Sequence, residues 1–353
     1  MATNLRGVRR GYADIGNGLQ MYYETMGEGT PLVMLHQSWW NSFEFEGVIP
    51  LLAKRHKVYA FDTPGFGFSG PAPEAWEFCD FTDAVVRAMD ALGIEKAHFA
   101  GQHTGSLMMA DLDARYTDRC DCMCYGGLAI YNEELRKKKY GLRRMLGQNQ
   151  APYIKKLLPG DVIGNEGGLL QRKEDGSHMV EYWVEQQREN PDSKLEYIQR
   201  AAMANMLHYD KGGADALTVL LGFDLKRALT FCTRPSLQLV GSRDCVKKPL
   251  FETIVQAASY MKSDIIRFKV VYGAGIMGWL DYPYEYAEAC LAFIENPAAY
   301  VGTTGHELDL AMKEYLLLVP DEIEFQDDNK YRKPDRQAAA RRPGGRNPGK
   351  SKR

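Results

Sequence analysis

The strongest constraint on the fold is a five-residue turn at residues 101–105, with the sequence Gly-Gln-His-Thr-Gly. It follows a short apolar run at residues 97–100 and precedes a helical pattern at residues 106–112. Glycine at both ends allows the backbone to pass sharply from a strand into a helix. His103 is then expected at a strained, exposed apex above the first helical turn. Such a turn presents one side chain at the carboxyl end of a strand, where α/β sheets bind their ligands.

Apolar runs and helical patterns alternate on both sides of this turn. Buried strands are indicated at residues 31–36, 57–61, 122–130, 235–240 and 265–271, and helices at residues 78–92, 250–261 and 284–294. Two alternating runs, 12–15 and 19–25, are joined by Gly-Asn-Gly, which predicts a hairpin. Continuous apolar strands that alternate with helices are typical of a mainly parallel sheet with helices on both faces.

The pattern changes at residues 131–223 to amphipathic helical pieces broken by Gly and Pro. This predicts an α/β core formed by residues 1–130 and 224–300, with 131–223 inserted as a helical cap. A C-terminal extension follows at 301–325. Residues 326–353 are basic and rich in Gly and Pro, and we expect a disordered tail, with a weak electrostatic contact as the alternative.

The composition is that of a soluble globular protein. Of 353 residues, 45% are hydrophobic and 25% charged, and the net charge of -2 gives no reason to expect nucleic acid or an anionic membrane as partner. No apolar stretch is long enough to cross a bilayer, and the N-terminus has no signal-like apolar region. Seven cysteines, an odd number, favour free thiols in a reducing compartment, so a cytoplasmic location is expected.

Three of these cysteines, Cys120, Cys122 and Cys124, alternate along a predicted strand. Alternation places all three on one face of the sheet. A metal site needs neighbouring His or carboxylate ligands and a turn-like spacing, and neither is evident in the sequence. We therefore expect core thiols and no metal.

Four further segments complete a resemblance to a known superfamily. They are Leu-His-Gln-Ser at residues 35–38, Asp-Thr-Pro-Gly-Phe-Gly-Phe-Ser at 62–69, Gly-Ser-Arg-Asp at 241–244 and Gly-Ala-Gly-Ile at 273–276. In this order they resemble the oxyanion segment, the Asp-x-x-Gly-x-Gly-x-Ser loop, the acid-bearing turn and the Gly-x-Gly-His segment of the α/β-hydrolases. Residues 101–105 resemble the Gly-x-Ser-x-Gly nucleophile elbow of that superfamily. The resemblance implies an eight-stranded α/β-hydrolase sheet.

The resemblance also implies where a catalytic triad would lie. The nucleophile position is His103, the base position is Ile276 and the acid position is Asp244. Because isoleucine cannot take a proton, serine-type acyl transfer by the usual route is excluded. The hydroxyls of Thr104 and Ser106 are weak alternatives, since the first is expected to point away from the apex and the second lies further into the helix.

The role of His103 has two interpretations. A helix N-terminus and a dry cavity both oppose a positive charge, so its pKa is expected at or below about 6.5. A neutral imidazole there is suited to proton abstraction, C–C cleavage or base-assisted attack by water. The alternative is a polar wall group or a relic of lost activity. Asp244 likewise has either a catalytic or a residual structural role.

The remaining site residues follow from the same resemblance. The oxyanion hole would use backbone N–H groups of Thr104 and of Gln37 or Ser38. The substrate pocket is expected to include Trp39, Trp40, Tyr131 and Ile276, although ordinary packing explains the two tryptophans equally well. Residues 65–70 match Gly-x-Gly-x-x-Gly, but the next helix begins only near residue 78, so no dinucleotide and no other cofactor is expected.

These observations predict an atypical α/β-hydrolase-fold enzyme without the Ser-His pair. Its substrate would be a small apolar or aromatic carbonyl compound, and His103 would act as general acid or base in a lyase reaction, in C–C cleavage or in water-mediated hydrolysis. The alternative is a catalytically inactive ligand-binding protein of the same fold. No nucleic-acid or membrane partner is expected, and the sequence leaves the oligomeric state open.

Overall fold

A computed structural model describes residues 7–38, 40–130, 193–211, 222–244 and 250–318, together with residues 180, 183, 184, 187 and 219. The strands are β1 (Arg9–Asp14), β2 (Gln20–Met26), β3 (Pro31–Leu35), β4 (Lys57–Phe61), β5 (Ala97–Gln102), β6 (Cys120–Gly126), β7 (Ser236–Gly241) and β8 (Ile266–Val271). The main helices are α1 (Ile49–Leu52), α2 (Phe78–Ala91), α3 (Thr104–Arg115), α7 (Leu195–Lys211), α9 (Leu225–Leu229), α10 (Leu250–Tyr260), α11 (Gly278–Asp281), α12 (Pro283–Glu295) and α13 (Gly305–Leu318). Two short 3-10 turns are η1 (Ser42–Phe45) and η2 (Thr117–Arg119).

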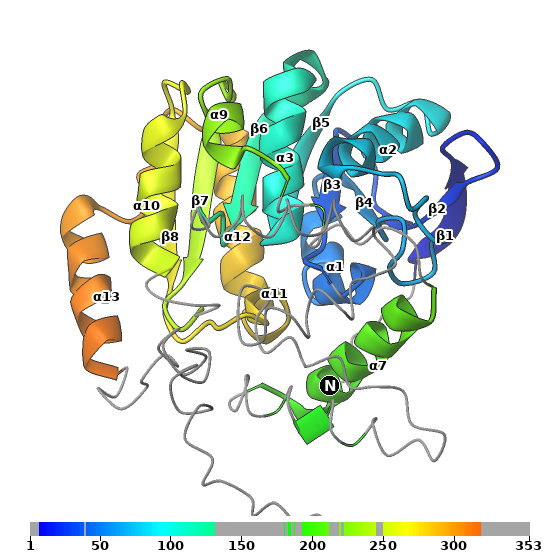
Figure 1. The fold of residues 1–353 in the computed structure, drawn as a ribbon. Coiled ribbons are helices and arrows are strands. Elements are labelled where there is room, and N and C mark those ends of the chain that lie inside the picture. The colour runs from blue at the N-terminus through cyan, green and yellow to red at the C-terminus, as the bar shows by residue number, and fades with distance from the viewer. Residues whose placement is uncertain are drawn as a thin grey trace, which may run out of the picture.

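The strands form one eight-stranded sheet in the order β1-β2-β4-β3-β5-β6-β7-β8 (Figure 1). The hairpin β1-β2 and the β2-β4 pair are antiparallel, and all other neighbours are parallel. The mainly parallel sheet predicted from the sequence is therefore confirmed. Because the strands from β3 onward are parallel, their carboxyl ends lie along a single edge of the sheet, where loops can bring distant residues together.

Two apolar clusters cover the two faces of the sheet. One contains buried residues of α2, α3, α9 and α10, and the other contains residues of η1, α1, α11 and α12. Figure 1 shows α2, α3, α9 and α10 in front of the strands and α12 behind them. Helices on both faces explain why the central strands are apolar on both sides, as the sequence pattern indicated.

The cysteines of β6 do not share one face, so that prediction was wrong. Cys120 packs in the cluster on the α3 side, whereas Cys122 and Cys124 pack in the cluster on the α12 side. The register between β5 and β6 shifts between Ala97 and Phe99, because two steps along β5 match three steps along β6. The extra residue reverses the alternation. Every described cysteine is a free thiol.

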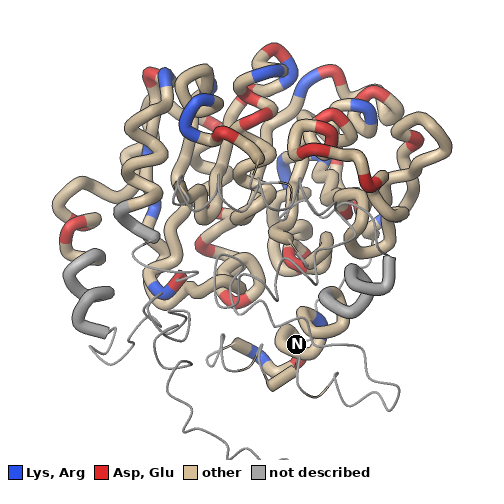
Figure 2. Tube along the Cα trace, in the orientation of Figure 1, with Lys and Arg blue, Asp and Glu red and all other residues tan. Residues whose placement is uncertain are grey.

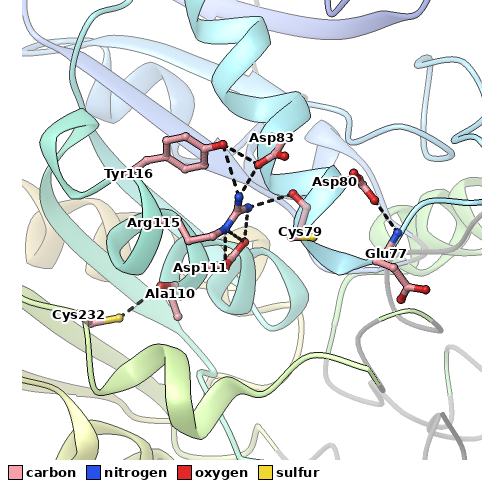
Figure 3. Close-up of polar contacts among 9 residues, drawn as sticks. All are labelled: Glu77, Cys79, Asp80, Asp83, Ala110, Asp111, Arg115, Tyr116 and Cys232. Atoms are coloured by element: carbon pink, nitrogen blue, oxygen red, sulfur yellow. Dashed lines mark hydrogen bonds and ion pairs between the residues drawn. The ribbon is translucent and has the colours of Figure 1, made fainter. Parts of the chain in front are cut away.

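The C-terminal end of α3 is fixed by a polar network around Arg115 (Figure 3). Its guanidinium donates to Asp111 at 2.6–3.0 Å, to Asp83 of α2 at 2.7 Å and to the Cys79 carbonyl at 3.0 Å. The Tyr116 hydroxyl also donates to Asp83, at 2.8 Å. The planar fork of Arg115 thus joins α3 to α2.

The predicted cap falls largely outside the described residues, and so do the tail at 326–353 and the end of the extension at 301–325. Within the cap segment, α7 is described. Its residues Ile198 and Ala201 pack with Phe43 and Leu280 in a third apolar cluster, and Arg200 forms an ion pair with Glu46. α7 therefore contacts the segments that follow β3 and β8 at the carboxyl edge of the sheet. The extension contains α13, whose Leu308 and Ala311 pack against Val240, Ile254 and Val270.

Charged residues of both signs are interspersed along the described helices (Figure 2). Among these helices, none has the length and apolar character needed to span a membrane.

Candidate active site

His103 lies at the N-terminus of α3 with φ 44° and ψ -108°, a conformation that costs on the order of 1–3 kcal/mol. The two flanking glycines permit it. A Cβ at Gly105 would lie 2.0 Å from the Leu35 carbonyl oxygen, and a Cβ at Gly101 would lie 2.7 Å from the Met109 sulfur. The sharp strand-to-helix turn predicted from the sequence is therefore present. The expectation that His103 is exposed at its apex was wrong, because only 7% of the residue is accessible to solvent.

The imidazole of His103 contacts the carboxylate of Asp244 directly. The Nε2 atom lies 3.1 Å from Oδ1 and 3.0 Å from Oδ2, and both side chains are buried. Because a carboxylate accepts hydrogen bonds, Nε2 holds a proton in this pair. No described residue forms a hydrogen bond with Nδ1. Asp244, for which the sequence predicted either a catalytic or a residual structural role, thus contacts the apex residue itself.

A second set of side chains holds this pair in place. The Gln102 amide donates to Asp244 Oδ2 at 3.2 Å, and the Trp279 indole donates to the Gln102 oxygen at 3.0 Å. Two glycines at the end of β6 leave the necessary space: Gly126 is its last residue and Gly127 follows it. A Cβ at Gly126 would lie 2.2 Å from the Gln102 oxygen, and one at Gly127 would lie 2.6 Å from His103 Cδ2.

The pKa of His103 departs from its ordinary value in the direction opposite to that expected. Burial, the largest influence, lowers the pKa. The charge and hydrogen bond of Asp244, together with the charge of Glu44, outweigh burial and raise the pKa above 6.5. The expectation from the sequence was wrong because it considered the helix terminus and a dry cavity but no carboxylate in contact with the imidazole.

Gln37 is not available as an oxyanion donor in this structure. Its backbone N–H donates to Glu44 Oε2 at 2.9 Å, and its side-chain amide donates to Glu44 Oε1 at 2.7 Å and to the Ile276 carbonyl at 3.3 Å. Glu44 is completely buried in η1, and burial raises its pKa to about 8 although the bonds from Gln37 lower it. The carboxyl group therefore occupies the donors that the resemblance had assigned to a substrate oxygen.

The other predicted donors are not engaged in this way. No described residue accepts a hydrogen bond from the backbone N–H of Thr104 or of Ser38. The buried Ser38 hydroxyl, which was not a predicted donor, has no partner among the described residues either. Ser106 is fully buried, and its hydroxyl donates to the Gly101 and Gly126 carbonyls at 3.0 and 2.8 Å. These bonds hold the elbow together and leave Ser106 unsuited to nucleophilic attack.

The predicted pocket residues divide into two groups. Trp39 and Tyr131 lie outside the described residues. Trp40 and Ile276 belong to one apolar cluster with α7, and the Trp40 ring stacks on Phe43 at 5.4 Å between centroids. Trp40 is 3% exposed, so ordinary packing accounts for it.

Two other motif segments have structural roles. His36 accepts from the Thr63 N–H at 3.0 Å through Nε2, which leaves Nδ1 to donate to the Gln37 carbonyl at 2.6 Å. The Asp62 carboxylate accepts backbone N–H groups of Ser42 and Phe68, both at 2.7 Å, and so shapes the loop after β4. The next helix begins at Phe78, as predicted. The described residues contain no group of three or more His, Cys, Asp or Glu that could hold a metal ion.

Sequence reasoning did not identify Glu44, Gln102 or Trp279 as site residues. A signal for Glu44 was present, because it is a charged residue between Phe43 and Phe45, in a segment that must pack against the sheet. Gln102 adjoins the apex on the strand side, where a polar side chain at a buried strand end needs a partner. Trp279 has no comparable local signal.

Comparison with known proteins agrees with the sheet and the elbow. Residues 30–125 match a family model described as alpha/beta hydrolase fold. The structure superposes on a hydrolase from Pseudomonas aeruginosa PA01 with a TM-score of 0.59 and 16% sequence identity, covering 81% of this chain and 98% of that one. The chain has the α/β-hydrolase fold.

Several relatives of known sequence are named as esterases or hydrolases. The chain is 22% identical to the pimeloyl-[acyl-carrier protein] methyl ester esterase of Aliivibrio salmonicida over 227 residues, which are 64% of this chain and 78% of the esterase. It is 33% identical to the 2-hydroxymuconate semialdehyde hydrolase of Pseudomonas sp. over 111 residues, 30% of this chain and 38% of that one. Five relatives that are 31–36% identical to the chain are covered over only 25–38% of their own length.

Proposed function

We propose that this α/β-hydrolase-fold chain is an enzyme in which His103, oriented by Asp244, transfers protons during water-mediated hydrolysis of a small apolar or aromatic carbonyl compound. The observation that supports this most strongly is the contact of 3.0–3.1 Å between His103 Nε2 and the buried Asp244 carboxylate. It fixes the tautomer and leaves Nδ1 as the nitrogen able to accept a proton.

The proposed reaction proceeds without an acyl-enzyme. His103 Nδ1 takes a proton from a water molecule as that water attacks the carbonyl carbon, and the Asp244 carboxylate stabilises the imidazolium that forms. The proton then returns from Nδ1 to the leaving group. The backbone N–H of Thr104, at the N-terminus of α3, is the donor best placed to stabilise the developing oxyanion. Esters are the favoured substrates, because a relative that the match covers over 78% of its own length is an esterase.

The pH dependence follows from the raised pKa of His103. A base must be neutral to act, so turnover should fall as the pH drops through this pKa. Because the pKa lies above 6.5, the acid limb of the rate profile should have its midpoint above 6.5 also. A midpoint below 6.5 would contradict the proposed base.

The decisive experiment begins with a screen of small esters and lactones, followed by His103→Gln. Glutamine keeps a similar size and hydrogen bonding but cannot act as a base, so turnover should fall on the order of 10²–10⁴-fold. His98→Gln is the matched control, since His98 is a partly buried histidine near the amino end of β5, whereas His103 follows the carboxyl end of that strand. Equal rates for unsubstituted protein and His103→Gln would refute the proposal.

A second candidate function is ligand binding without reaction. It is favoured by Ile276 in the base position and by Glu44, which occupies the Gln37 donors. In that case a ligand found by thermal shift should bind without being converted, and His103→Gln should change its affinity only.

A further inference from the structure

The two edges of the sheet differ in what lies against them. Outside β8, the chain after α12 covers the edge: the Thr303 N–H donates to the Phe268 carbonyl at 2.6 Å, and the Val270 N–H donates to Thr303 Oγ1 at 2.9 Å. Arg267 also donates to the Tyr300 carbonyl at 2.9 Å. The opposite edge is β1, and no described segment pairs with its outer side (Figure 1). An unpaired edge is a template for another strand, so its occupant has to be identified.

The backbone groups of β1 that face outward belong to alternate residues. Tyr12 lies opposite Tyr22 in the antiparallel pair β1-β2. The Tyr22 carbonyl accepts from the Asp62 N–H at 3.0 Å, on the side of β2 away from β1. In an antiparallel pair, two opposite residues either exchange both hydrogen bonds or direct their backbone groups outward. The N–H and C=O groups of Tyr12 therefore face outward, and with them those of Arg10 and Asp14.

The side chains at these three positions complement themselves. When a second β1 lies antiparallel to the first with Tyr12 opposite Tyr12, Arg10 of each copy faces Asp14 of the other. Both residues are exposed, and Arg10 uses Nε for its 2.8 Å bond to Glu24, so the rest of its fork remains able to donate to a carboxylate. Opposite charges directly across an antiparallel pair stabilise it. A shift by one residue would set outward groups against inward ones, and a shift by two would separate Arg10 from Asp14, so the register is specified.

Aromatic side chains extend along the same face of the sheet. Tyr12 and Phe68 are 53% and 59% exposed, and Tyr22 lies between them. The ring centroids are 5.5 Å apart for Tyr12 and Tyr22 and 5.1 Å apart for Tyr22 and Phe68. Aromatic residues are enriched at protein interfaces. A twofold axis at Tyr12 would continue this row of rings into the second copy.

We propose that β1 is the interface of a symmetric homodimer, in which two β1 strands pair antiparallel about a twofold axis at Tyr12 and join two eight-stranded sheets into one. The partner is a second copy of this chain, because the edge complements its own charges in the register that its backbone groups require. This inference goes beyond the proposed function and does not depend on it. β1 lies four strands from β5, which carries the elbow, so association and turnover are measured separately.

The test is the association state of the full chain by sedimentation velocity. At micromolar concentration the unsubstituted protein should have twice the mass of one chain. Asp14→Arg and Arg10→Asp each set like charges against one another at both contacts, and each should raise the dissociation constant on the order of tenfold or more. Mixed in equal amounts, these two variants regain both opposite-charge pairs, so the mixture should dimerise again. Asp264→Arg, the same charge reversal at an exposed position before β8, is the matched control and should leave the dimer unchanged.

A monomeric unsubstituted protein at high micromolar concentration would overturn the proposal, since the charges of β1 would then keep the edge unpaired. A dimer that Asp14→Arg leaves intact, an equal weakening by Asp264→Arg, or a mixture that stays monomeric would overturn it also. If Arg10→Asp does not fold because it loses Glu24, Tyr12→Pro replaces the mixture. The Tyr12 N–H faces outward, so proline there should keep the fold and abolish the dimer. An unchanged dissociation constant in Tyr12→Pro would contradict the strand pairing.

Discussion

The two ends of α3 are held by carboxylates in opposite ways. At the C-terminal end, one permanent cation, Arg115, is paired with Asp111 and Asp83 at 2.6–3.0 Å (Figure 3). At the N-terminal end, two buried carboxyl groups, Asp244 and Glu44, influence a single imidazole whose charge depends on pH. The first arrangement is typical of a structural contact, and the second of a functional site.

The backbone differs between the two ends as well. His103 is strained at φ 44°, whereas Tyr116, which caps the other end, has an ordinary negative φ of -130°. Strain and buried carboxyl groups both lower stability, so the N-terminal end of α3 retains features that folding alone would not select. The elbow therefore contains features that destabilise the fold and the C-terminal end of α3 does not, a difference that is typical of functional sites.

The largest expected effect is on turnover, when one aspartate at each end of α3 is replaced by asparagine. Asp244→Asn should lower turnover on the order of 10²–10⁴-fold, because the amide no longer fixes the tautomer of His103 or stabilises its charged form. Asp111→Asn should leave turnover unchanged and lower the free energy of unfolding by about 1–3 kcal/mol, because Arg115 loses a buried charged partner. Steady-state kinetics and urea unfolding measure both. Comparable turnover losses in the two variants would remove the distinction between the ends.

The next effect concerns the space around the imidazole. Gly127 has φ 60°, and a Cβ there would meet His103 Cδ2 at 2.6 Å and Nε2 at 2.8 Å. Gly127→Ala should therefore displace His103 from Asp244, reduce turnover at least tenfold and destabilise the fold by roughly 2–4 kcal/mol, the sum of strain and overcrowding. Gly93 at the end of α2 has φ 67° with no atom within 4 Å of the added carbon.

Gly93→Ala is therefore the matched control for Gly127→Ala. It introduces the same left-handed strain without a clash, so it should cost only about 1–2 kcal/mol and leave turnover unchanged. Full activity in Gly127→Ala would show that the His103 position seen here is not needed for function.

The sheet could be predicted from the sequence because its signals are local. Residues 57–61 form a buried strand as expected, because a continuous apolar run is a signal carried by those residues alone. The helix α2 begins at Phe78 as expected, because the helical spacing of its apolar residues is also a local signal. The elbow was predictable for the same reason, because Gly101 and Gly105 determine the turn together with the two elements that flank it.

The chemistry of the site depends on contacts that no local pattern contains. His103 and Asp244 are 141 positions apart, and only the sheet order brings β5 and β7 to the same edge. The raised pKa of His103 follows from that contact, so an argument from the helix terminus and a dry cavity gave the wrong direction. Glu44 was missed because its partner, Gln37, was expected to face a substrate. The face of the sheet on which Cys120 lies was predicted wrongly, because a one-residue register shift between two strands cannot be recognised from the alternation of residues along one of them.

The smallest expected effect tests whether the Arg115 end is structural only. Arg115→Lys keeps the charge but replaces a planar fork, which reaches Asp111, Asp83 and the Cys79 carbonyl together, by a single ammonium. We expect a loss of about 1 kcal/mol in the free energy of unfolding, since Arg115 is partly exposed and water compensates some of the lost bonds.

Arg55→Lys is the control, because the Arg55–Glu295 pair is more exposed and should contribute close to nothing. Turnover and the His103 midpoint should be unchanged in both variants. A shifted His103 midpoint in Arg115→Lys would mean that the two ends of α3 are coupled through the helix, and the site would then have to be described as including Arg115.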